Sequence, residues 1–419
     1  MKAIDRFAAY VGIDWADTKH DVCVQAAGEP TMEFSILEHT PEAIAAWADS
    51  MRHRYNGQPV AICLELDKGP LVYALREYDF FVLFPVNPLS LARFREAFAT
   101  SGAKDDPSDA RLQLELVLKH RDRLRPLKPS SPTIQTLEQL VEYRRRLVSD
   151  KVRLVSRLIS VLKNYYPQVL DWFEYRDTRL FCDFLTRWPT LDVLQRVRRS
   201  TLERFFYARQ VRSAALIERR IEGIKAARPL TTDESIMAPN RLLAQAVVKQ
   251  LRDVLAAIAR FDEEIAQCAR SHPDFELFHA LPGAGEALVP RLMVAFGDQR
   301  ERYASAADIQ KYAGIAPVTE RSGKHWSVHW RWRCPKFLRQ TFIEWANKSI
   351  HHSFWAQMFY QQQRERGKSH QAAIRALAFK WIRIVFRCWQ ERRLYDESTY
   401  LSALQKRGSP LIQNLANSV

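Results

Sequence analysis

Near the start of the chain, hydrophobic positions form two kinds of pattern, one typical of strands and one typical of helices. Short apolar runs, rich in β-branched or aromatic residues, predict strands, and apolar positions at the helical period predict helices between and after them. Such an order is typical of a mixed sheet with helices packed against it. The strands are expected at residues 10–14, 21–25, 60–64 and 80–85, and the helices at 41–54, 71–78, 89–98 and 107–119.

A Pro- and Ser-rich segment at residues 126–132 breaks this pattern and marks a linker. After it, apolar residues recur at spacings of three, four or seven over residues 137–161, and a second such stripe covers 243–265. These stripes are typical of coiled-coil helices, although Arg144 and Lys151 interrupt the first one. We expect an antiparallel pair or a dimerisation arm, and two core helices of a bundle explain the pattern equally well.

A helical, Arg-rich insert at about 171–235 separates the two long helices, and from residue 275 onward the chain reads as mainly helical. We therefore expect an α/β plus all-α protein: a mixed sheet, then long coiled-coil helices, then a mainly helical domain. The expected domains are 1–125, 126–274 and 275–395, followed by a weakly ordered tail at 396–419.

Charge and cysteine usage narrow the class of protein. The chain has 63 Lys and Arg against 48 Asp and Glu, a net charge of +15. Such a surplus favours polyanions, above all nucleic acid, although charge that only maintains solubility is the alternative. Six scattered cysteines without a Cys-x-x-Cys pair argue against a zinc site or disulfides. With no secretion signal and no apolar run near the ~20 residues of a membrane span, we expect a cytoplasmic protein without membrane contact.

Four acidic residues are spaced as a divalent-metal site requires. Asp14 and Glu65 each end an apolar strand, and Asp106 and Asp109 stand three apart at the start of a predicted helix, on one face. Mg²⁺ prefers oxygen ligands, and two such ions can activate a hydroxyl and stabilise the leaving oxygen of a phosphodiester. Each acid alone is explained as well by ordinary strand ends and helix starts. Together they predict metal-dependent chemistry on nucleic acid.

These acidic segments resemble a known family. The runs YVGID at 10–14, CLEL at 63–66 and KDDPSDA at 104–110 resemble the N-terminal RuvC-like domain, with an RNase H fold, of DEDD-type insertion-sequence transposases. The family usually has Thr where this chain has Asp105, which leaves open whether Asp105 or Asp106 is the ligand.

The second half of the chain resembles the C-terminal domain of the same family. LPGAG at 281–285, FGD at 296–298, YAGIAP at 312–317 and RSGK at 321–324 occur in the family's order. One departure is CPKFLR at 334–339, where the family usually has Gly-Asn before Leu-Arg. The resemblance covers roughly residues 8–120 and 275–350.

The resemblance implies an activity and partners. Asp14, Glu65, Asp106 and Asp109 would bind Mg²⁺, or Mn²⁺ in its place, and Ser322 would attack a DNA phosphate to give a covalent phosphoserine. Since Ser322 lies in another predicted domain than the acids, the site would combine both, within one protomer or between two. The partners implied are element-end and target DNA, and a guide RNA that pairs with both. The resemblance also implies a dimer or tetramer of the chain. Its expected location is a bacterial or archaeal cytoplasm, near the nucleoid. Without the resemblance, Ser-Gly in a basic loop is an ordinary turn.

Two segments are candidate nucleic-acid contacts. Gly283 and Gly285 precede a helix, as in a helix-hairpin-helix whose N–H groups approach phosphate, and an ordinary turn explains them as well. The later run mixes cations with flat rings, which suits phosphates and unpaired bases, or else forms a strand that buries Val328, Trp330 and Trp332. The candidate contacts there are Arg321, Lys324, Trp326, Arg331 and Arg333.

We therefore expect an RNA-guided DNA recombinase that uses divalent metal ions and Ser322. The alternative is a RuvC-like nuclease that uses metal-activated water and forms no covalent intermediate. A third interpretation is a catalytically inactive nucleic-acid-binding protein that assembles through its coiled coils.

Overall fold

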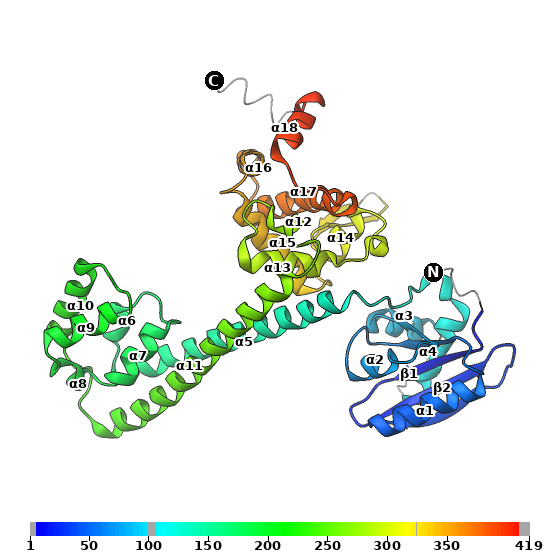
Figure 1. Cartoon of the computed structure of the whole chain (residues 1–419), viewed down its shortest axis with the longest axis horizontal. Coiled ribbons are helices and arrows are strands. Elements are labelled where there is room, and N and C mark those ends of the chain that lie inside the picture. The colour runs from blue at the N-terminus through cyan, green and yellow to red at the C-terminus, as the bar shows by residue number, and fades with distance from the viewer. Residues whose placement is uncertain (1–5, 99–105, 324, 410–419) are drawn as a thin grey trace. The chain divides into compact units, whose positions relative to one another are not determined.

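The computed structural model of the protein describes residues 6–98, 106–323 and 325–409, without the side chains at 97, 98, 106 and 107 (Figure 1). The chain divides into two compact units, Met1–Pro129 and Ser130–Val419, which are described separately. None of the helices in these described segments is both long and apolar enough to cross a membrane. The architecture is α/β in the first unit and almost wholly helical in the second, as the sequence predicted.

The first unit is built on a five-stranded mixed sheet with the order β3-β2-β1-β4-β5. The central strand β1 is antiparallel to β2 and parallel to β4. β3 was not predicted, because five of its six residues are exposed at the sheet edge and give no apolar run. The strands are β1 (Ala9–Asp14), β2 (Lys19–Ala26), β3 (Glu33–Glu38), β4 (Val60–Leu64) and β5 (Phe81–Pro85).

Helices cover both faces of this sheet. On one face, Val11 and Ile13 pack with α1 (Pro41–Arg54) and α2 (Pro70–Leu75). On the other, α4 crosses β1 so closely that a side chain at Gly12 would collide with the carbonyl of Ala110. Only glycine permits that contact. The further helices of this unit are α3 (Pro88–Phe98), α4 (Asp106–Lys119) and the short η1 (Arg121–Arg123).

Two long helices, α5 (Pro132–Tyr165) and α11 (Glu234–Arg270), pack against each other along the second unit (Figure 1). The start of α5 and the end of α11 share one hydrophobic core, and the end of α5 and the start of α11 share another. The two helices are therefore an antiparallel pair within the chain. Of the alternatives that the sequence left open, the antiparallel pair is the one that the single chain forms.

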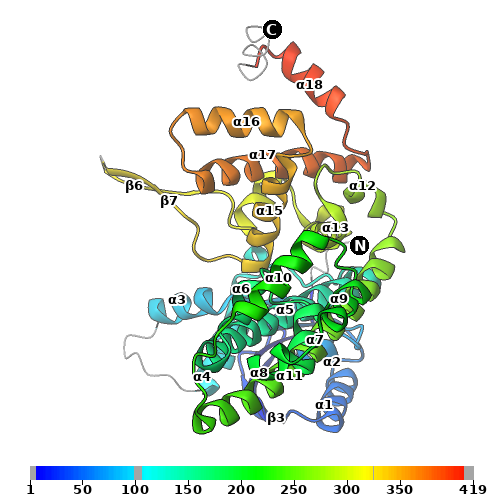
Figure 2. The same cartoon turned by 90° about the vertical axis from the view of Figure 1, so that its left-hand side faces the viewer.

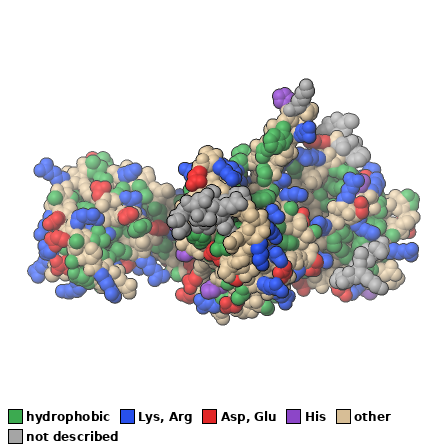
Figure 3. Space-filling model, turned by 90° about the horizontal axis from the view of Figure 1, so that it is seen from above, with side chains coloured by type: hydrophobic (Ala, Val, Ile, Leu, Met, Phe, Trp, Pro, Cys, Tyr) green, Lys and Arg blue, Asp and Glu red, His purple; other side chains and the backbone are tan. Residues whose placement is uncertain are grey.

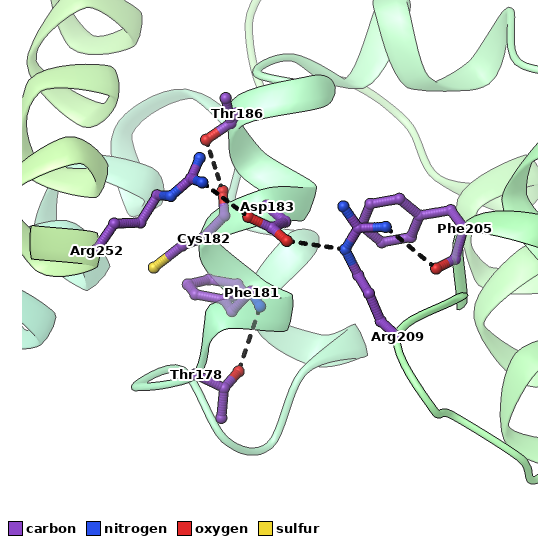
Figure 4. Close-up of polar contacts among 8 residues, drawn as sticks. All are labelled: Thr178, Phe181, Cys182, Asp183, Thr186, Phe205, Arg209 and Arg252. Carbon is purple, nitrogen blue, oxygen red and sulfur yellow. Dashed lines mark hydrogen bonds and ion pairs between the residues drawn. The ribbon is translucent and has the colours of Figure 1, made fainter. Parts of the chain in front are cut away.

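One of these cores belongs to a helical lobe, the segment that the sequence marked as an Arg-rich insert. Several of its arginines have internal partners: Asp183 receives a hydrogen bond from Arg209 at 2.9 Å and lies 3.6 Å from Arg252 of α11 (Figure 4). The first of these pairs lies within the lobe, and the second joins the lobe to α11. The helices of the lobe are α6 (Val169–Trp172), α7 (Arg179–Arg187), α8 (Leu191–Gln195), α9 (Arg199–Ala208) and α10 (Ala214–Ala226).

The other core belongs to a C-terminal lobe, where buried tryptophans dominate. The indole N–H of Trp345 donates to the carbonyl of Pro282 at 3.0 Å, and that of Trp389 donates to the carbonyl of Gly297 at 3.0 Å. Because each buried indole has an acceptor, this core holds its loops rigidly. Its helices are α12 (Phe275–His279), α13 (Gly285–Phe296), η2 (Arg300–Arg302), α14 (Ala306–Tyr312), α15 (Lys336–Ser349), α16 (Phe354–Glu365), α17 (His370–Glu391) and α18 (Glu397–Lys406).

The expected weakly ordered tail is wrong for its first part. Residues 397–406 form α18, because Asp396 caps the helix by accepting from the Ser398 N–H and because Tyr400 and Leu401 pack against the C-terminal lobe. Residues 410–419 lie outside the described part of the chain.

A two-stranded hairpin, β6 (Val318–Ser322) and β7 (His325–His329), extends away from α16 and α17 of the C-terminal lobe (Figure 2). On the face seen in Figure 3, basic side chains are spread among acidic and apolar ones. Net charge alone therefore does not single out a site.

Candidate functional site

Asp14 and Glu65 come together through the register of the sheet. The parallel strands β1 and β4 pair Ile13 with Leu64, so that Asp14, the last residue of β1, lies next to Glu65, the residue that follows β4. Side chains alternate between the faces of a strand, which puts Asp14 on the face of Gly12, and Glu65 on the face of Cys63. Both of these positions face the α4 side. The two carboxylates therefore share one end and one face of the sheet.

Helix α4 brings its N-terminal turn to the same end of the sheet. Ala110 lies against Gly12, and Val117, two turns later, shares a cluster with Phe7, which precedes β1. The helix therefore runs antiparallel to β1, and Asp109 lies toward Asp14 rather than toward the start of the strand. Asp106 begins this helix, but its side chain, like residue Asp105, lies outside what the structure describes.

Of the three acids whose side chains the structure describes, Asp109 is buried, with only 3% of its surface exposed. The guanidinium of Arg95, on α3, donates a hydrogen bond to its carboxylate. An ionised carboxylate in such a place is costly unless it is paired, and Arg95 provides the opposite charge. Sequence reasoning missed Arg95, because its link to Asp109 depends on how α3 packs on α4.

The donor set fits a hard divalent cation, because it offers carboxylate oxygens alone, from two strand ends and a helix start. Among the side chains that the structure describes, no three of the Asp, Glu, His or Cys groups are close enough to hold an ion. Asp109 is engaged by Arg95 instead. Binding of one cation by three or more of these carboxylates would thus require the described side chains to move closer together.

The loop after Asp14 is held by a buried histidine. The N–H of Ala16 donates to Nδ1 of His20 at 3.3 Å, so Nε2 carries the proton and donates to His39 at 3.0 Å. Burial, and then the nearby charge of His39, lower the pKa of His20 to about 4. The ring of Trp15 stacks on His20. The histidine is therefore neutral at pH 7 and fixes the backbone beside Asp14.

Ser322 lies at the tip of the hairpin. It ends β6 and pairs in register with His325, and the turn between them contains Gly323 with φ +58°. Residue Lys324 lies outside the described part of the chain. Ser322 is exposed, and no side chain among the described residues is hydrogen-bonded to its hydroxyl. Activation of this serine would have to come from groups brought by the substrate or by another part of the protein.

The hairpin and the segment after it expose aromatic rings. Trp326 is 69% exposed, Val328 51% and Trp332 76%. The alternative of a strand that buries Val328, Trp330 and Trp332 is therefore wrong for Val328 and Trp332, whereas Trp330 is half-buried and has Arg375 over its ring. Exposed indoles beside cations suit stacking on unpaired bases. Of the candidate contacts, Arg321 and Arg333 are exposed and Arg331 is half-buried.

Family models match both halves of the chain. Residues 11–167 match a model of DEDD transposases of the IS110 type, described as transposase, and residues 275–361 match the transposase IS116/IS110/IS902 family. The chain belongs to the DEDD-type insertion-sequence transposases. The first match covers the strands that carry Asp14 and Glu65, and the second covers the hairpin.

Individual relatives are similar to the chain over most of its length. The chain is 29% identical to a mini-circle putative transposase for IS117 of Streptomyces coelicolor, over 98% of this chain and 99% of that protein. It is 26% identical to the insertion element IS116 uncharacterized 44.8 kDa protein of Streptomyces clavuligerus, over 92% of this chain and 96% of that protein. It is 24% identical to the insertion element IS900 uncharacterized 42 kDa protein of Mycobacterium paratuberculosis, over 72% and 75%.

Two glycines of the transposase that were candidates for phosphate contact differ in their surroundings. A side chain at Gly283 would come within 2.9 Å of the backbone of Lys348, so tight packing on α15 explains this glycine. Gly285, with φ +55°, has open space where its side chain would be. Of the two, Gly285 leaves the backbone accessible to a ligand.

Proposed function

We propose that this transposase cuts and rejoins DNA through attack by Ser322 on a phosphodiester, with Asp14, Glu65, Asp106 and Asp109 as ligands of divalent metal ions. The observation that carries the proposal is the placement of Asp14 and Glu65 on neighbouring strands, beneath the end of α4 where Asp109 lies. Asp14 and Glu65 at the ends of β1 and β4, and Asp109 in the first turn of α4, lie at the same end of the sheet. An exposed serine at a hairpin tip is accessible to a substrate as large as DNA.

The proposed step exchanges one phosphate ester for another. The Oγ of Ser322 forms a bond to phosphorus, the bond from phosphorus to one sugar oxygen breaks, and that oxygen takes up a proton while the serine loses one. Mg²⁺, or Mn²⁺ in its place, would supply the positive charge that stabilises the attacking and leaving oxygens. Because the phosphoserine conserves the ester bond, a hydroxyl of a second strand can reverse the step and restore the serine without another energy source.

The proposed partners are element-end and target DNA, a guide RNA, and further copies of the chain as a dimer or tetramer. Support for DNA comes from the transposase family, and a polyanionic partner in general suits the net charge of +15. The guide RNA and the assembly come from the resemblance alone. With a guide, base pairing would choose the sequence and the protein would contact the backbone.

The test is a search for protein covalently attached to DNA. Full-length protein with its co-purifying RNA is incubated with element-end DNA and Mg²⁺, and the products are separated by denaturing electrophoresis. We expect an adduct with the wild type and with Ser327→Ala, an exposed serine of the same hairpin, and none with Ser322→Ala or after chelation of the metal. An adduct in Ser322→Ala contradicts the serine mechanism. Cleavage without any adduct, equal in both variants, favours the nuclease alternative.

A further inference from the structure

The base of the hairpin forms a pocket that the proposed chemistry does not use. Its cavity of about 200 Å³ is lined by the turn at residues 314–317, by residues 328–331 and by Arg375 from α17. The turn is fixed in place, because a side chain at Gly314, which has φ +69°, would collide with Cys334. The volume is several times the ~30 Å³ share of one water molecule and admits a phosphate group.

Two arginines contact the ring of Trp330 beside this pocket, and Arg331 follows Trp330 in the chain. The guanidinium of Arg375 lies over the indole ring, and that of Arg339, on α15, lies 5.9 Å from the ring centre. Arg339 also donates to the backbone carbonyl of Arg331 at 3.4 Å. The Nε atoms of Arg331 and Arg375 are buried without a hydrogen-bond partner. Within the described part of the chain, no carboxylate forms an ion pair with any of the three arginines.

Such a cluster is costly without a counter-charge. Burial, and then the positive charge of Arg339, lower the pKa of Arg375 to about 10. The helical lobe shows the opposite arrangement, since Asp183 there lies between Arg209 and Arg252 (Figure 4). Arg209 and Arg252 thus share one acid, whereas the arginines at the hairpin base keep donors that an anion would satisfy.

We propose that this pocket binds a phosphate group of the DNA strand on which Ser322 acts. The guanidinium fork matches phosphate oxygens in a bidentate geometry, and the pocket is lined by Arg331, Arg375 and His329 beside its apolar residues. DNA rather than a free anion is favoured because the pocket lies at the foot of the hairpin whose tip carries Ser322. The inference rests on the proposed function, in which that hairpin approaches DNA. The pocket would then hold the backbone while the tip reaches the attacked bond.

The test measures how DNA binding depends on salt. Fluorescence anisotropy of a short labelled DNA duplex is followed with full-length protein over a range of salt concentrations. Each neutralised phosphate contributes about 0.9 to the slope of log affinity against log salt. We expect Arg375→Gln and Arg339→Gln each to flatten the slope by about one contact, and Arg375→Lys to restore it. Arg387→Gln is the matched control, since Arg387 is exposed on the same helix and already pairs with Glu391 at 2.9 Å.

The slope separates binding from folding, because a merely structural loss lowers the amount of active protein without changing the number of phosphate contacts. If Arg375→Gln fails to fold by circular dichroism, the half-buried Arg339→Gln alone decides. A wild-type slope in the folded variants overturns the proposal, and so does a slope change seen with an RNA duplex but not with DNA.

The same measurement in an Ser322→Ala background keeps the two proposals apart. There the loss of slope caused by Arg375→Gln must persist, because phosphate binding does not need the serine hydroxyl. A covalent adduct that fails to form at Ser322, with the slope effect intact, contradicts the serine mechanism and leaves the pocket. An intact adduct with no slope effect contradicts the phosphate pocket and leaves the serine mechanism.

Discussion

The carboxylate edge of the first unit and the serine hairpin of the second are built in opposite ways. At the carboxylate edge, α4 is packed directly on β1 and Asp109 is 3% exposed. At the hairpin, Ser322 and both of its neighbours in the described turn are exposed, and only the base is anchored, through Gly314 and Cys334.

This difference follows from what each region would have to do. Groups that hold a small cation need fixed positions, and a packed helix on a sheet supplies them. A nucleophile for a bond inside a large duplex must reach outward, and a two-stranded extension lets it do so while its base stays fixed. Rigidity and reach are thus assigned to separate elements of the chain.

The largest effect should follow loss of one charge at the rigid edge. In Glu65→Gln, the carboxamide keeps the shape but loses the negative charge, and DNA cleavage should fall by roughly 10²- to 10³-fold. Asp67→Asn, an exposed acid two residues later, is the control and should remain near wild type. Gel assays of cleavage and titration calorimetry with Mn²⁺ would measure both. Unchanged cation binding in Glu65→Gln would remove that residue from the site.

Matched glycine variants sharpen the contrast in packing. Gly12→Ala places a methyl group against the carbonyl of Ala110 and should lower the free energy of unfolding of the first unit by about 3 kcal/mol. Gly323→Ala meets no atom within 4 Å and should cost only about 1 kcal/mol, for the φ of +58°. Urea unfolding with hydrogen exchange at 9–14 and 318–329 would report each region. Equal losses at the two sites would show that the two glycines are packed equally tightly.

Acidification should lower the stability of the first unit and raise that of the hairpin. His20 has a folded pKa of about 4, below the ordinary 6.5, so the unfolded chain binds more protons between these values. The first unit should therefore lose up to about 3 kcal/mol of stability as pH falls from 6.5 to 4. His20→Gln should flatten that dependence in urea titrations at pH 7 and pH 5. A pH profile identical in this variant and the wild type would show that His20 does not set it.

In the hairpin, by contrast, a histidine has a raised pKa. The carbonyl of Trp330 and the carboxylate of Glu320, both 2.9 Å from His329, raise the pKa of that histidine above its ordinary value. The stabilisation is complete below pH 6.5 and is lost as pH rises through the folded pKa. Hydrogen exchange across β6 and β7, corrected for intrinsic pH dependence, should slow on acidification in the wild type and not in His329→Gln. Faster exchange at low pH would contradict this sign.

The smallest effect concerns an exposed ring. Trp326→Ala should weaken binding of single-stranded DNA about 10-fold, the value of one stacked base, without lowering the melting temperature. Tyr175→Ala, an aromatic residue of the helical lobe that is 68% exposed, is the control and should bind as the wild type does. Anisotropy and thermal melting would measure both. A drop in melting temperature for Trp326→Ala would mean that the ring packs rather than stacks.

Much of the fold could be predicted from the sequence, because buried strands and amphipathic helices leave periodic patterns. The strands ending at Asp14 and Glu65 and the helix carrying Asp109 fall close to where the pattern placed them. β3 escaped because its side chains Phe34 and Ile36 face outward at the edge and no apolar run marks the strand. Exposure erases the signal on which such predictions depend.

The partners around the candidate site could not be predicted in the same way. Arg95 meets Asp109 through helix packing, and Arg375 reaches Trp330 from a helix some forty residues later in the chain. No local spacing encodes such meetings, and ordinary surface arginines have the same sequence appearance. The hairpin around Ser322 was read as a basic loop, because glycine and serine signal a turn without saying how far its flanks extend as strands.

The antiparallel pairing of α5 and α11 has a consequence for engineering the molecule. Because the helical lobe is inserted between the two helices, its separation from the C-terminal lobe is a length that can be reset. One extra heptad in each helix keeps the apolar stripes aligned and adds roughly 10 Å, at 1.5 Å per residue. A graded series of such insertions would change the separation of the two lobes in steps of known length.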